Sequence, residues 1–102
     1  MKTVNISIDW SNKDSIAAAE KAKQSLDREN DNRNLMRLDL DSSKSRLKEV
    51  VSLWQEGMLT SADKLEAISG YETAKANMAI ADYRYQVATA TMADVMGITG
   101  KE

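Results

Sequence analysis

The chain has 102 residues, with 14 basic and 16 acidic side chains, so its charges nearly cancel. This length allows one domain at most, and the charge balance argues against nucleic acid as a partner. Cysteine and histidine are both absent, which excludes disulfides and thiolate metal sites and removes the commonest general base. We therefore expect no enzyme activity, no cofactor, no metal site and no catalytic residues.

Helix-forming residues dominate the sequence. Proline is absent, only four glycines occur, and Ala, Lys, Glu, Leu and Met are frequent. We expect an all-α fold, a long antiparallel helical hairpin of the coiled-coil kind preceded by one short strand. The expected single unit is a strand over about residues 3–10, a helix over about 12–56, a turn over about 57–60 and a helix over about 61–96.

Two helices in contact along a single seam bury little apolar surface. Ordering each backbone residue costs about 1–2 kcal/mol of free energy. The stabilisation from the apolar surface buried along one seam exceeds this cost by only a small margin. We therefore expect the chain to associate with copies of itself as a homo-oligomer.

Residues 4–10 alternate between apolar and polar side chains. The apolar set is Val4, Ile6, Ile8 and Trp10. This period of two predicts a strand with one apolar face, which needs a partner strand from elsewhere or from another copy. The other interpretation is a disordered start that merely alternates. No segment reaches the roughly 20 apolar residues of a membrane-spanning helix, so membrane contact is expected through this strand alone.

The first helix carries one apolar seam in steps of four and three residues. The seam positions are Ala22, Leu26, Glu29, Arg33, Met36, Leu40, Ser43, Leu47, Val50 and Trp54, three of which are polar. The run 27-DRENDNRN-34 has no apolar residue at all. It is either a solvated segment where the seam is weak or a face that lines water or contacts a polar partner.

Gly57 marks the turn between the helices. A glycine just past a helix end adopts the left-handed conformation at low cost, and Thr60 or Ser61 can then accept hydrogen bonds from the first amides of the next helix. Asp63 is favourably placed near the positive end of that helix. Met58 and Leu59 lie at the tip, where they serve as a docking point or pack onto Trp54 and Leu65 across the turn.

The second helix has a strict heptad of small and large residues. Its helix-packing positions are Ala67, Tyr71, Ala74, Met78, Ala81, Tyr85, Ala88 and Met92. A second apolar set, Leu65, Ile68, Ala76, Ala79, Ile80, Tyr83, Val87 and Ala90, widens the apolar surface beyond what one partner helix covers. We therefore expect neighbours on two sides of this helix, and we interpret Gly70 as a site of close packing or a small bend.

The run 54-WQEGMLTSADKLEA-67, followed by 71-YETAKANMAIADYRYQVATATMADVMG-97, resembles the closing helical hairpin of the TolC-like outer membrane efflux proteins. The family pattern has an aromatic residue three positions before a turn glycine, then a hydroxyl residue, Asp-x-Leu-x-Ala, alanines at heptad spacing, an aromatic residue and a final glycine. The matching positions here are Trp54, Gly57, Thr60 or Ser61, Asp63, Leu65, Ala67, Ala74, Ala81, Tyr83, Ala88 and Gly97.

This resemblance implies a hairpin in the wall of an export tunnel, located at the outer membrane and in the periplasm. It implies that the tip, formed by Trp54, Gly57, Met58, Leu59 and Thr60, docks a periplasmic adaptor protein. Asp63 and Glu66 become candidates for gating the tunnel entrance. The other interpretation of Asp63 is a helix-start charge, and that of Glu66 is a solvated face.

A soluble helical-hairpin module that binds a partner protein is the alternative function. It requires neither further strands nor a secretion signal, and the N-terminus has no apolar run of the kind that such a signal contains. If the chain is a complete product, we expect it to be cytoplasmic. This alternative has no use for the alternating residues before Ser11, whereas the channel interpretation needs them as a strand.

Overall fold

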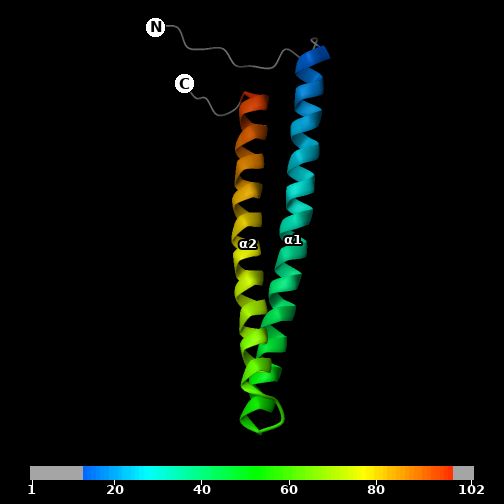
Figure 1. The fold of residues 1–102 in the computed structure, drawn as a ribbon. Helices are drawn as coiled ribbons and strands as arrows, with labels where there is room; N and C mark the ends of the chain where they lie inside the picture. Colours follow the sequence, from blue (N-terminus) through cyan, green and yellow to red (C-terminus); the bar gives the residue numbers. More distant parts are fainter. Residues whose placement is uncertain (1–12, 98–102) are drawn as a thin grey trace, which may run out of the picture. The chain divides into compact units, whose positions relative to one another are not determined.

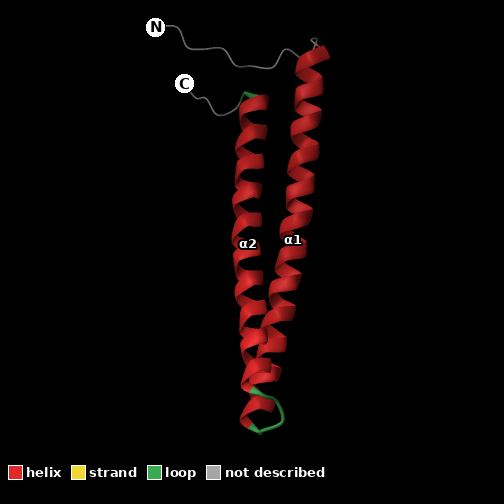
Figure 2. Cartoon of the chain, viewed as in Figure 1, coloured by secondary structure: helices red, strands yellow, loops and turns green. Residues whose placement is uncertain are grey.

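The computed structural model of the chain describes residues 13–97. This part consists of two α-helices, α1 (Lys13–Gln55) and α2 (Ser61–Met96), which Figure 1 shows on either side of one short turn. The predicted all-α class and helical hairpin are confirmed. Figure 2 shows no strand within residues 13–97, and the strand expected over about residues 3–10 lies outside the described part of the chain.

Contacts divide the described chain into two compact units. The first, residues 32–82, contains the end of α1, the turn and most of α2, and the second joins residues 13–31 of α1 to residues 83–97 of α2. The boundary in α1 falls inside the polar run 27–34. Burial of apolar groups drives helix packing, and this run offers no apolar side chain for it. The backbone of α1 remains helical through the whole run.

The unit of residues 32–82 is an antiparallel hairpin with a core of small side chains. Its buried residues are Val50, Ala67, Ala74 and Ala81. Ala81 keeps only 1% of its surface exposed, so the α2 backbone approaches α1 closely at this level. Alanine seams permit such an approach because no long side chain separates the helices. The neighbouring seam residues Tyr71 and Met78 are half-buried beside them.

The unit of residues 13–31 and 83–97 repeats this arrangement. Ala19 and Ala22 of α1 and Ala88 of α2 are buried, and Tyr85 and Met92 are half-buried. Within each unit, therefore, alanines form the closest contact and larger residues flank it.

The seam positions of α1 lie on one face of the helix, whether their side chains are apolar or polar. From Ala22 to Trp54 every position of the predicted register is buried or half-buried, including Glu29, Arg33 and Ser43. A heptad register depends on geometry rather than on the polarity of any single position, which explains why three polar side chains leave it intact.

The second apolar set of α2 is mostly exposed in the chain by itself. Leu65, Ile80, Tyr83 and Val87 are among the most exposed large apolar residues, and Ile68 alone of this set is half-buried.

Gly70 is not a site of close packing. No atom lies within 4 Å of where a Cβ at Gly70 would be, apart from the neighbouring helix backbone, and α2 continues through it. The interpretation of this glycine as a packing contact is wrong for the chain by itself, because its environment is open space.

Candidate functional site

The hairpin tip begins with a complete Schellman motif at the end of α1. The Met58 amide donates to the Leu53 carbonyl at 2.9 Å, and the Gly57 amide donates to the Trp54 carbonyl at 3.0 Å. Gly57 has a φ of 77°, the left-handed conformation that this motif requires. These bonds satisfy carbonyls that the helix end would otherwise leave unpaired.

Thr60 caps the first turn of α2. The Thr60 hydroxyl accepts a hydrogen bond from the Asp63 amide at 3.1 Å and donates to Asp63 Oδ2 at 2.9 Å. The Thr60 amide donates to the same Oδ2 at 3.0 Å. This reciprocal pattern is a capping box in which Asp replaces the usual Glu or Gln. Of the two hydroxyl residues predicted for the cap, Thr60 fills the role.

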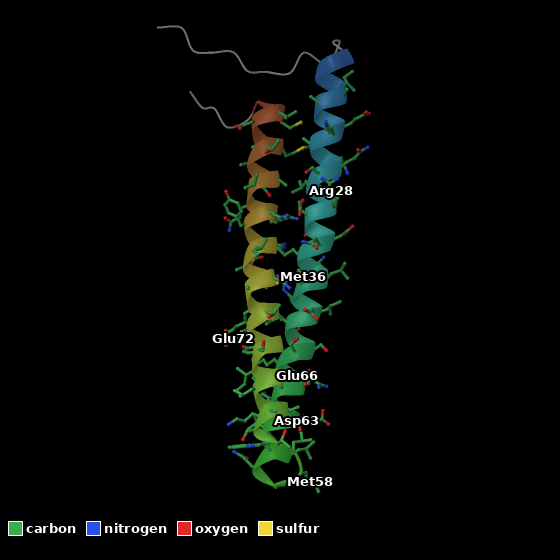
Figure 3. All side chains as sticks on the ribbon, viewed as in Figure 1. Arg28, Met36, Met58, Asp63, Glu66 and Glu72 are labelled. Atoms are coloured by element: carbon green, nitrogen blue, oxygen red, sulfur yellow. The ribbon has the colours of Figure 1, made fainter. Side chains whose placement is uncertain are left out.

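The cap also changes the acidity of Asp63. The backbone amide of Thr60, and secondly its hydroxyl, hold the pKa of the Asp63 carboxyl below its ordinary value of 3.8, against a smaller opposing effect of desolvation. The structure thus engages Asp63 as a helix-start charge. Glu66, the other gating candidate, lies exposed on α2 one turn further from the tip (Figure 3).

Trp54 spans the turn. Its indole Nε1 donates to Ser61 Oγ at 3.4 Å, and the Lys64 ammonium lies 3.5 Å from the ring centre. A cation over an indole face is attracted to its negative charge density. The sequence pattern missed Lys64 as a tip residue, because helical spacing does not pair residues on opposite sides of a turn.

The tip presents one prominent apolar side chain. Met58 is 68% exposed, and Figure 3 places it at the very end of the hairpin. Leu59 is half-buried and Trp54 is half-buried, whereas Gly57 and Thr60 are exposed. Leu65 is 62% exposed, so neither Met58 nor Leu65 is buried by packing across the turn.

A groove lies in the other unit, between residues 13–31 and 83–97. It consists of two crevices of about 200 and 310 Å³. Both are lined by Ser25 of α1 and Thr91 of α2, so the crevices adjoin there. The seam pattern did not predict this groove. The signal available in the sequence is the pair of small residues Ser25 and Thr91. Each lies about one helical turn from a seam alanine, Ala22 or Ala88.

Residues 13–97 contain no group of three or more acidic, histidine or cysteine side chains that could hold a metal ion. Neither α1 nor α2 contains a stretch long and apolar enough to cross a bilayer.

Comparisons of this chain with models of protein families, with curated proteins and with solved structures find no match. The resemblance to the TolC-like family therefore stays a prediction from the residues of the turn and of α2.

Proposed function

We propose that this chain is a structural component of an export channel: a helical hairpin that packs beside neighbouring hairpins in the wall of an α-helical tunnel. In this proposal the hairpin lies in the periplasm of a cell with an outer membrane, and its tip docks a periplasmic adaptor protein. The resemblance of residues 54–67 and 71–97 to the TolC-like family suggests the setting. The geometry of α2 supports the mode of assembly.

The observation that carries the proposal is that α2 is apolar on two opposite faces. Ala76, Tyr83 and Ala90 each follow a buried seam alanine by two residues, which is about 200° around a helix. Leu65 precedes Ala67 by two residues and is exposed. Since α1 covers one face of α2 in each unit, the second face is available to a neighbouring hairpin. A wall of hairpins requires such helices, because each must contact one neighbour on either side.

The tip supports the docking part of the proposal. The Schellman motif and the capping box fix the backbone on both sides of Met58 and Leu59. A rigid loop loses little conformational freedom on binding, and an exposed methionine adapts its shape to an apolar pocket. A preorganised tip with an exposed Met58 is therefore suited to docking.

Sedimentation equilibrium of the purified chain, with and without mild detergent, tests the assembly. We expect a closed assembly of several copies. Ala76→Asp and Tyr83→Asp should each reduce it by placing a charge in an apolar contact, whereas Lys48→Asp on the exposed side of α1 should not. A monomer under both conditions, or an assembly that both α2 variants leave intact, would contradict the wall proposal.

Adaptor binding and export test the docking part. Met58→Asp and Leu59→Asp should weaken both, because each buries a charge at the contact. Gly70→Ala, on α2 away from the tip, is the matched control. If both tip variants bind and export normally, docking through this tip is wrong even where the assembly is observed.

A second candidate function is a helical-hairpin module that binds a partner protein. The groove between residues 13–31 and 83–97 favours it, since its lining of mostly small residues from two helices suits a further helix. Deletion of the residues before Ser11 distinguishes the two functions. A module should keep its fold and partner binding, measured by circular dichroism and titration calorimetry, whereas the channel component should lose assembly in detergent.

A further inference from the structure

The groove of the unit formed by residues 13–31 and 83–97 has side chains of opposite charge at the two ends of its α1 side. Ser25 and Thr91 lie at its centre, where the two crevices adjoin. On α1, Lys21 lines one crevice and Glu29 lines the other, each four residues from Ser25. On α2, Val95 and Val87 line the same two crevices, each four residues from Thr91. We call these six residues the paired groove. The crevice of Glu29 is also lined by Tyr83 and Arg84 of α2.

The six residues of the paired groove are arranged so that they are complementary to the same six residues of a second copy. Four helical residues span about 6 Å, so Lys21 and Glu29 lie equally far from the level of Ser25, in opposite directions. A second copy that packs groove to groove and is turned end for end brings its own Glu29 opposite Lys21, and its own Lys21 opposite Glu29. The same rotation brings Val87 of one copy opposite Val95 of the other. Such twofold contacts are the commonest way in which identical chains associate.

The floor of the groove permits close approach. Ala22 and Ala88 are each only 6% exposed and line the crevices beneath the paired residues. Ser25 and Thr91 are short, so helices of a second copy meet no long side chain at the centre. Among the ion pairs of the described residues, those formed by lysine join Lys23 to Asp27 and Lys75 to Glu72. Lys21 and Glu29 take part in neither pair.

We propose that the paired groove is the interface of a homodimer in which α1 packs antiparallel to α1 of the second copy, with two Lys21–Glu29 contacts between the copies. The proposal does not depend on the channel function. It uses the groove between the two helices, whereas the tunnel wall would use the face of α2 opposite its seam. The two surfaces share Tyr83 and Val87, which line the groove and also belong to the second apolar set of α2. Within this unit the helices of the two copies run antiparallel, which further distinguishes the dimer from a wall of parallel hairpins.

Charge reversal and its rescue test the ionic contacts. Lys21→Glu and Glu29→Lys should each weaken dimerisation of the full chain about tenfold or more in sedimentation equilibrium, because each places like charges opposite one another. The double variant Lys21→Glu with Glu29→Lys should restore the dimer. Lys44→Glu, an equal charge change at an exposed position of α1 outside the groove, should leave it unchanged. Circular dichroism verifies that each variant is helical.

Disulfide cross-linking tests the position of the twofold axis. The natural chain has no cysteine, so Ser25→Cys introduces a single thiol at the proposed axis and should form a covalent dimer rapidly on mild oxidation. Ser45→Cys, exposed on α1 in the other unit, should cross-link much more slowly. A monomeric wild type, a double variant that stays monomeric, or equal cross-linking at the two positions would each overturn the proposal.

Discussion

The Lys64 ammonium lies 3.5 Å from the centre of the Trp54 ring, so the first turn of α2 is joined to the last turn of α1 by a cation–π contact. The same ring donates to Ser61 through its Nε1. Trp54 thereby contacts α2 with both its face and its edge. The turn of this hairpin is held by side chains from both helices as well as by backbone hydrogen bonds.

Replacement of Lys64 by methionine keeps the length of the side chain and removes its charge. We expect Lys64→Met to lower the free energy of unfolding by about 0.5–1 kcal/mol, the usual strength of an exposed cation–π contact. Urea denaturation at a fixed protein concentration measures this change. Lys48→Met, exposed on α1, is the control and should change stability little. Equal losses in the two variants would mean that the ring contact contributes nothing measurable.

Gly57 and Gly70 should respond in opposite directions to alanine. At both positions the space that a Cβ would occupy has no atom within 4 Å beyond the glycine's own neighbours, but only Gly57 has a positive φ. Gly57→Ala should therefore destabilise the hairpin by about 1 kcal/mol through backbone strain alone. Gly70→Ala should stabilise it by up to about 1 kcal/mol, because alanine is the better helix former.

Asparagine at position 57 sharpens this test. Asn tolerates the left-handed conformation better than Ala, so thermal denaturation should rank the stabilities as Gly57, then Asn, then Ala. If Ala and Asn were equally destabilising, the cost would arise from something other than φ.

The buried alanines of α2 should not tolerate larger residues. Ala81 is 1% exposed, and Ala81→Leu should destabilise the hairpin by about 1–3 kcal/mol, since it forces the two helices apart. Ala17→Leu places the same change at an exposed position of α1 and should alter stability by less than about 0.5 kcal/mol. Similar effects of the two changes on urea denaturation would show that the seam is looser than its burial indicates.

Periodicity was sufficient to predict the two helices and the seam of α2. The steps from Ala67 to Ala88 identify the positions that are buried, because a helix turns through a fixed angle per residue. Local chemistry predicted Gly57 at the turn and Asp63 near the helix start. Pattern reasoning could not predict the Lys64–Trp54 contact or the groove around Ser25 and Thr91, since both depend on how two helices lie against each other. Of the two interpretations of Gly70, close packing is wrong, because a glycine inside a helical pattern does not reveal whether another atom lies nearby.

The stability of the hairpin should depend on pH through the carboxyl of Asp63. Folding lowers the pKa of its carboxyl below the ordinary value of 3.8, first through the Thr60 amide and then through the Thr60 hydroxyl. The ionised form is therefore the stabilised one. Its contribution is fully present at pH values well above 3.8 and is lost as the pH falls through the lower, folded pKa.

Asp63→Asn removes this titration while it keeps a side-chain acceptor for the Thr60 amide. Wild type should exceed the variant in free energy of unfolding at neutral pH, and the difference should shrink as the pH falls below about 3.8. Urea denaturation over a series of pH values measures it. Thr60→Val removes only the hydroxyl, so a carboxyl titration by NMR should show the Asp63 pKa rising part of the way towards its ordinary value, because the amide is the larger cause. If the stability difference between wild type and Asp63→Asn stayed constant from neutral to strongly acidic pH, the capping bonds would not depend on the charge of Asp63.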